Sequence, residues 1–106
     1  MDITKLKETI QKKNSLEIND DLAIEECWKI EVEILSDDIL ETINFIQTCS
    51  EDEFYGLAEV FPDVIDKTQS QDLYKAMCER NDSLSNHEYK KSNMTDLKYA
   101  REALLH

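Results

Sequence analysis

The chain contains one glycine and one proline among its 106 residues, and this scarcity restricts the possible folds more than any other feature. Hairpins of β-strands rely on turn residues with a left-handed backbone, above all in Asn-Gly and Asp-Gly pairs. Gly56 instead follows a tyrosine, so no such pair exists. A sheet built from hairpins is therefore not expected, and we predict an all-α fold.

Apolar residues recur at helical spacing along most of the chain. The inward-facing positions are predicted to be Ile3, Leu6 and Ile10; Ala23, Cys27, Ile30 and Ile34, widened by Ile24, Trp28 and Leu35; Ile39, Thr42, Ile43, Ile46 and Cys49; Phe54, Leu57, Ala58 and Phe61; Leu73, Ala76 and Met77; and Leu97, Ala100 and Leu104. These stripes predict a compact bundle of six or seven short helices in one domain, residues 1–106. The stretch KIEVEIL (29–35) also alternates with period two, so a strand is the alternative there. Helix is favoured because no second strand exists to pair with it.

Capping residues predict several helix ends. N-caps are expected at Ser36, Ser50, Ser70 and Thr95. Asp37 and Asp38 would then lie in a first turn, near the positive end of the helix dipole. Ser50 with Glu53 has the pattern of a capping box, and Pro62 is expected to end one helix and to begin a short one, DVIDK. The polar segment 81–93 is predicted to be irregular.

The negative charge is concentrated in the middle of the chain. The net charge is −12, and residues 17–66 hold sixteen acids and a single base, Lys29. The flanking segments 1–16 and 67–106 are slightly basic, so the central segment carries the whole imbalance. Nucleic acid and anionic membranes both need a basic footprint and are therefore excluded as partners. Simple solubility is one explanation of the acidity, and a functional surface for a basic protein partner is the favoured one.

Residues for catalysis or for metal binding are sparse. The histidines are His87, in the polar segment, and His106, at the end of the chain, where a side chain is seldom held rigidly. Gly56 stands alone, so no phosphate-binding loop is present, and the acid clusters lack the alternating ligands and central glycine of a calcium loop. We expect no enzymatic activity, no metal and no cofactor.

The cysteines and the first residues bear on the compartment. Cys27, Cys49 and Cys78 are odd in number and lack Cys-x-x-Cys spacing, which is typical of reduced thiols in a cytosol. MDITKLKETI has no apolar run of signal-peptide length, and no segment approaches membrane-spanning length. A cytoplasmic protein is expected.

Acidic side chains are predicted to line one side of the helical hairpin 50–70. With the apolar stripe of Phe54 inward, Asp52, Tyr55 and Glu59 point outward together. The other predicted members of this acidic surface are Asp63 and Asp66 beyond Pro62, and Asp37, Asp38 and Glu41 on the preceding helix, with Glu31 and Glu33 adding charge to the same half of the chain. Tyr55 could serve as an interface anchor among these acids or could lie flat on a neighbouring helix.

The segment SEDEFYGLAEVFPDVIDKTQSQDLYKAMCER resembles the central part of small acidic α-helical immunity proteins from bacterial toxin–immunity pairs, including the partners of contact-dependent growth inhibition toxins. A stretch of the form EEF–WLSEVFDDI–EKTQS recurs in that family. It is matched here by Glu53, Phe54, Leu57, Glu59, Val60, Phe61, Asp63, Ile65, Lys67, Thr68, Gln69 and Ser70. With the upstream DILETINFIQ, the resemblance covers roughly residues 37 to 80. The chain departs from the family at Gly56, where Trp is usual, and at Pro62, where Asp is usual, so we expect a looser helix around Gly56.

The resemblance implies a cognate inhibitor. Such proteins neutralise the C-terminal domain of a toxin, most often a nuclease, in the cytosol of the producing cell. The similarity extends to partners of EndoU-type and RNase A-like ribonucleases, so the expected partner is a basic ribonuclease domain. Two alternatives remain open: a helical adaptor or regulatory subunit that binds through an apolar groove, and an acidic nucleic-acid mimic that binds several basic proteins.

Overall fold

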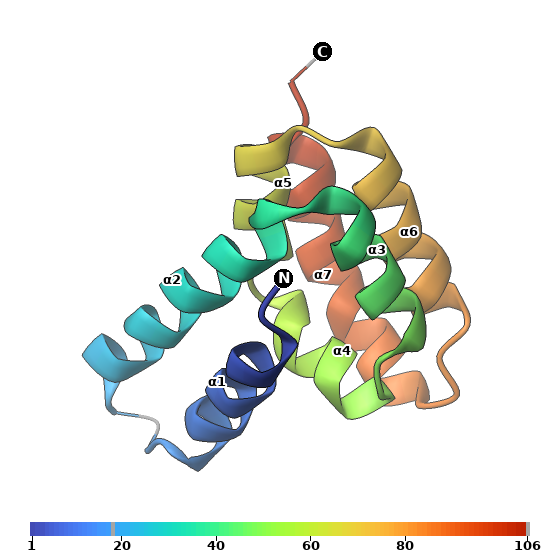
Figure 1. Ribbon diagram of the computed structural model, residues 1–106. Helices are drawn as coiled ribbons and strands as arrows, with labels where there is room; N and C mark the ends of the chain where they lie inside the picture. The colour runs from blue at the N-terminus through green and yellow to red at the C-terminus, as the bar shows by residue number, and fades with distance from the viewer. Residues whose placement is uncertain (18, 106) are drawn as a thin grey trace.

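The computed structural model describes residues 1–17 and 19–105, and these residues form seven α-helices and no strand (Figure 1). The helices are α1 (Ile3–Ser15), α2 (Asp21–Asp37), α3 (Ile39–Thr48), α4 (Glu51–Ala58), α5 (Phe61–Thr68), α6 (Gln71–Asp82) and α7 (His87–Ala103). The predicted all-α bundle of six or seven helices is confirmed. Segment 29–35 lies inside α2, so the strand alternative is wrong.

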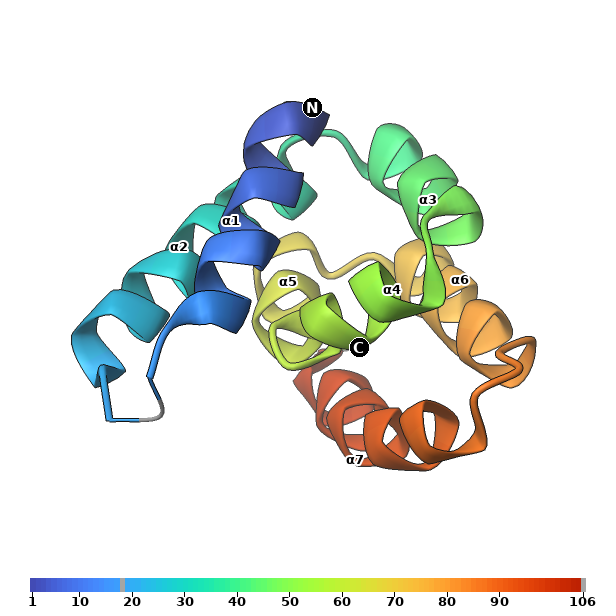
Figure 2. The same cartoon turned by 90° about the horizontal axis from the view of Figure 1, so that it is seen from below.

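The helices pack around a central α5. Figures 1 and 2 show α1 and α2 side by side as an antiparallel pair, and α3 packs against α6 on another side of the molecule. Helix α5 contacts both α2 and α7, while α7 also contacts α4 and α6. Because α1 packs on α4 as well as on α2, the three helices α1, α4 and α7 come together around one region of the surface.

The core confirms most of the predicted apolar faces. Phe54, Leu57 and Phe61 are fully buried, and the rings of Phe54 and Phe61 lie 5.3 Å apart between centroids. One contiguous cluster of buried residues draws members from every helix of the described chain. Ile3 is an exception, since 46% of its surface is exposed at the first residue of α1.

Two predicted helix starts are confirmed in atomic detail. The Ser50 side chain accepts a hydrogen bond from the Glu53 amide at 3.1 Å, and the Glu53 carboxylate accepts one from the Ser50 amide at 3.0 Å, which completes the capping box. Ser70 caps α6 by accepting from the amide of Leu73 at 3.1 Å. Pro62 lies in the first turn of α5, where its missing amide proton leaves no donor unsatisfied.

The predicted caps at Ser36 and Thr95 are wrong. Helix α2 continues through Ser36, and the extended residue Asp38 caps α3 instead, because its carboxylate accepts from the amide of Glu41 at 3.2 Å. Asp is as effective an N-cap as Ser, so the sequence alone does not decide between these neighbouring positions. Asp37 is accordingly the last residue of α2.

The polar segment 81–93 is mostly helical, contrary to prediction. Asn86 caps α7 by accepting from the amide of Tyr89 at 3.0 Å, so the helix begins well before Thr95. The Glu51 carboxylate, from α4, also accepts hydrogen bonds from two backbone amides at the start of α7. The Ser85 amide donates to Oε2 and the Asn86 amide donates to Oε1, each at 2.9 Å. These bonds fix the start of α7 to α4. His87 is thus the exposed first residue of a helix rather than part of a loop, and His106 lies outside the described residues.

Candidate functional site

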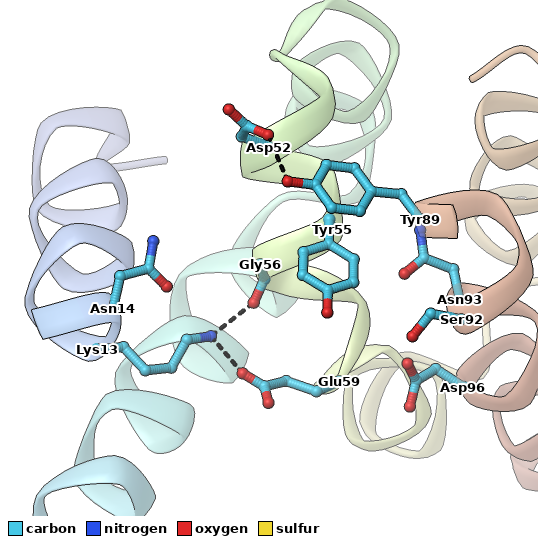
Figure 3. Close-up of a pocket in the computed structure, with 10 residues that line it drawn as sticks. All are labelled: Lys13, Asn14, Asp52, Tyr55, Gly56, Glu59, Tyr89, Ser92, Asn93 and Asp96. Carbon is cyan, nitrogen blue, oxygen red and sulfur yellow. Dashed lines mark hydrogen bonds and ion pairs between the residues drawn. The ribbon is translucent and has the colours of Figure 1, made fainter. Parts of the chain in front are cut away.

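A cavity of about 520 Å³ opens between α1, α4 and α7 (Figure 3). Three of the predicted contact residues, Asp52, Tyr55 and Glu59, line it from α4 and from the residue after α4. Helix α7 adds Tyr89, Ser92, Asn93 and Asp96, and α1 adds Lys13 and Asn14. We refer to this hollow as the acidic cavity.

Helical spacing explains why these side chains meet. Asp52, Tyr55 and Glu59 lie at i, i+3 and i+7, on the side of α4 opposite the buried Phe54 and Leu57. On α7, Tyr89, Asn93 and Asp96 lie at i, i+4 and i+7 and so share one face of that helix. The packing of α4 on α7 brings the two rows face to face.

Two tyrosines form the aromatic wall of the acidic cavity. The rings of Tyr55 and Tyr89 are stacked, with centroids 4.1 Å apart and planes inclined by 9°. The Tyr89 hydroxyl donates a hydrogen bond of 2.8 Å to a carboxylate oxygen of Asp52, and this bond, with partial burial, raises the pKa of Tyr89. Tyr55 lies flat on a residue of a neighbouring helix and still exposes 42% of its surface. The two interpretations of Tyr55 are therefore compatible in this structure.

Lys13 is the base that lies at this cavity, and its ammonium is already occupied. It donates to Glu31 Oε1 at 2.9 Å and to the Gly56 carbonyl at 2.6 Å, and it pairs with Glu59 Oε1 at 2.7 Å. Glu31 is fully buried, so it adds nothing to the acidic surface expected of it. Burial raises the pKa of Glu31, and the attraction of Lys13 opposes that shift. Lys13 thus joins α1, α2 and α4 rather than neutralising the cavity.

Unpaired acids give the cavity its negative charge. Among the described residues, neither Asp52 nor Asp96 has an ion pair. Partial burial raises the pKa of Asp96, and repulsion from Glu59 adds to the shift. The Asn93 side chain is 1% exposed; its amide nitrogen donates to Asn81 Oδ1 at 3.1 Å, while its own Oδ1 has no hydrogen-bond partner in the described structure.

Gly56 allows α1 to approach α4 closely. A Cβ atom at position 56 would lie 3.3 Å from the Cγ2 atom of Ile10, tighter than ordinary contact. The Gly56 carbonyl also receives the Lys13 ammonium. Helix α4 continues through Gly56, so the expectation of a looser helix there is not met. A larger residue at position 56 would therefore require the Ile10 side chain to shift.

The other five predicted contact residues lie outside the acidic cavity. Asp63 borders a separate groove beside Trp28 and Val32 of α2, and Asp66 is exposed on α5. Asp37, Asp38 and Glu41 lie at the junction of α2 and α3, at the opposite end of α3 from α4 in Figure 1. The structure therefore divides the predicted acidic surface into separate places.

Seven of the ten residues that line the cavity were not predicted as site residues from the sequence, and four of them carry the argument here: Lys13, Tyr89, Asn93 and Asp96. The last three share one helix face, and the Asn86 cap was the signal that could have revealed it. Their row was missed because segment 81–93 has no aliphatic stripe. The partnership of Lys13 with Glu31 spans eighteen residues and has no sequence signature.

No arrangement in the described residues resembles a metal centre, since no three His, Cys, Asp or Glu side chains are grouped to hold an ion. None of the described helices has both the length and the apolar character needed to cross a membrane. Comparisons with protein-family models, with curated proteins and with solved structures found no match to this chain.

Proposed function

We propose that this protein is an immunity protein, which binds a basic toxin domain and neutralises it, and that the acidic cavity with its rim is the centre of the contact. The expected toxin is a ribonuclease, such as an EndoU-type or RNase A-like domain, encoded as the C-terminal part of a large secreted protein. Inhibition requires no catalysis by the immunity protein, and its action is expected in the cytoplasm.

One observation carries this proposal: the unpaired carboxylates of Asp52 and Asp96 flank the exposed ring of Tyr55 at a single hollow. An RNA-cleaving site must be basic to hold phosphates. An acidic surface complements such a site, accelerates its encounter and competes with the substrate. Simple solubility does not require acids from two helices to converge on one cavity beside an aromatic side chain.

Rigidity of this surface supports the same proposal. Tyr55 is held by its stack on Tyr89, and Tyr89 is held in turn by its hydrogen bond to Asp52. A side chain that is already ordered loses less entropy when a partner binds. Tyrosine is also among the residues at which interface energy concentrates, because it buries a large ring and keeps a polar tip.

The test is inhibition of a candidate toxin by the purified protein. The first candidate is the C-terminal domain of any large secreted protein encoded immediately upstream. We expect stoichiometric loss of its ribonuclease activity, and no inhibition of related toxin domains. A folded protein that fails to inhibit its neighbour's domain at a large excess, or that inhibits unrelated basic nucleases equally well, would contradict the proposal; the second result indicates a general nucleic-acid mimic.

The groove beside Trp28 favours a second candidate, a helical adaptor. It has a volume of about 490 Å³ and is lined by Trp28 and Val32 with a charged rim; Leu22, on the same helix, is 79% exposed. An adaptor that binds an apolar segment there should depend only weakly on salt. A binding rate that falls steeply with salt favours the immunity protein instead.

A further inference from the structure

We infer that the acidic cavity is a receptor for one arginine side chain of the protein partner, with the guanidinium held between the Tyr55 ring and the polar groups of α7. This inference rests on the proposed function, since a basic partner must supply the arginine. It goes further in naming the chemical group that enters the cavity and the atoms that receive it.

The cavity has acceptors in need of donors. Asn93 Oδ1 is buried without a partner, and an unsatisfied buried acceptor costs free energy that a ligand donor would recover. In Figure 3 the oxygens of Asn93 and Asp96 point from α7 towards the cavity, and the Tyr55 hydroxyl points towards its Glu59 side. The neutral oxygen of Asn93 and the carboxylates of Asp96 and Glu59 form a set of acceptors. Such a set suits a cation that carries several N–H groups.

Lys13 prepares the site without filling it. Its ammonium holds one carboxylate oxygen of Glu59, Oε1, and is shared with the buried Glu31. Among the described residues, Glu59 Oε2 takes part in no ion pair. Lys13 is therefore already paired with two acids, and the unpaired charges of Asp52 and Asp96 are left for a ligand.

Arginine fits this arrangement better than other cations. Its planar guanidinium carries five donors in a rigid fork and stacks on aromatic faces, whereas the lysine ammonium is a compact, strongly hydrated charge. A cavity of about 520 Å³ is in the size range of organic ligand sites and is too large for a bare ion. The negative charge excludes phosphates and carboxylates.

The experiment titrates the full chain with single capped residues and follows its backbone amide chemical shifts by NMR. The probes are N-acetyl-arginine methylamide, the matching lysine derivative and free L-arginine. Capped arginine is expected to bind in the millimolar range, at least about tenfold more tightly than capped lysine, with shifts confined to residues around the cavity. Free arginine should bind no more tightly than the capped form, since a side chain of a protein is the proposed ligand.

Three results would overturn the inference. They are the absence of saturable binding, equal affinity for capped lysine, and free arginine binding at least about tenfold more tightly than capped arginine, which would indicate a metabolite site. Each of these leaves the proposed inhibition of a toxin to be judged by its own assay. Conversely, arginine binding without inhibition of any toxin would contradict the proposed function alone.

Variants assign the binding to the named atoms. Asp96→Asn keeps the size of the side chain and removes its charge, and Tyr55→Leu removes the aromatic face; each should weaken capped-arginine binding at least about fivefold. Glu102→Gln makes the same charge change on α7 at an exposed position outside the cavity and should leave binding unchanged. If Glu102→Gln weakens binding as much as Asp96→Asn, overall charge rather than the cavity explains it. Unchanged binding in both cavity variants overturns the inference.

Discussion

Tyr55 of α4 and Tyr89 of α7 stack in parallel, with 4.1 Å between their ring centroids, although thirty-four residues separate them in the sequence. The stack joins two helices and leaves the Tyr55 ring 42% exposed at the edge of the acidic cavity. An exposed aromatic side chain that is held in place by another is suited to contact a partner, because little of its freedom remains to be lost.

Truncation of Tyr55 should weaken toxin binding more than it weakens the fold. We expect Tyr55→Ala to cost more than about 1 kcal/mol of binding free energy, since interface energy concentrates in such aromatics. Tyr99→Ala is the matched control, because Tyr99 is also an exposed tyrosine, on α7, and does not line the cavity. Calorimetric titration of each variant with the toxin domain that the wild type inhibits gives the two binding free energies. An equal loss of binding free energy in the two variants would contradict the special role of Tyr55.

Loss of Lys13 should leave a buried charge without its counter-ion. The Lys13 and Glu31 side chains are 7% and 0% exposed, so Lys13→Met should destabilise the protein by about 3–5 kcal/mol. The double variant Lys13→Met with Glu31→Leu removes both charges and should regain most of that loss. Urea unfolding measures each free energy. A double variant no more stable than Lys13→Met alone would contradict this account, because the unpaired charge of Glu31 would then not be the cause of the loss.

Leu57→Ala tests the inward face of α4. Leu57 is fully buried, and the substitution should cost about 2–5 kcal/mol through lost burial and the remaining cavity. Thermal or urea unfolding provides the measurement. A variant as stable as the wild type would contradict the inward orientation of Leu57. The acidic cavity depends on that orientation, because the opposite side of α4 lines it.

Asp96 and Glu51 should affect stability with opposite pH dependence. Burial and the nearby Glu59 raise the pKa of Asp96, so the folded state holds its proton more tightly than the unfolded state. Wild-type stability relative to Asp96→Asn should therefore be greatest below the ordinary carboxyl pKa and should fall as pH rises through the raised value. Urea unfolding at several values between about pH 3 and 7 follows this difference.

Glu51 supplies the reverse case. Hydrogen bonds from the amides of Ser85 and Asn86 lower its pKa, so its contribution is present above the ordinary carboxyl pKa and is lost as pH falls through the lowered value. Relative to Glu51→Gln, the wild type should become less stable on acidification. If the stability difference between wild type and variant changed with pH in the same direction for both residues, the environment described for one of them would be wrong.

The sequence predicted the helices better than their surroundings. The stripe from Phe54 to Phe61 and the Ser50–Glu53 box are local patterns, and the structure confirms them because local propensity and burial agree there. The start of α7 could not be predicted from an apolar stripe, because the inward-facing residues of its first turns are Tyr89 and Asn93 rather than aliphatic residues. The helix is fixed there by the Asn86 cap and by Glu51 from another helix.

The candidate site was predictable only in part. The outward row of Asp52, Tyr55 and Glu59 follows from helix geometry, and the structure brings these three residues to one cavity. Their partners on α1 and α7 depend on how helices distant in sequence pack, which no local pattern encodes. Glu31 illustrates this limit. Its carboxylate was expected to add to the acidic surface, but it is buried and paired with Lys13, a contact that the sequence does not reveal.

The central claim, that the acidic cavity is the toxin-binding surface, is tested most directly by the association rate constant with the inhibited ribonuclease domain at several salt concentrations. Two double variants each remove two negative charges: Asp52→Asn with Asp96→Asn at the cavity, and Asp63→Asn with Asp66→Asn on α5. The cavity pair should slow association at least about tenfold and flatten its salt dependence, while the α5 pair should slow it less than about threefold. Equal slowing by the two pairs, or unchanged association in the cavity pair, would contradict the claim.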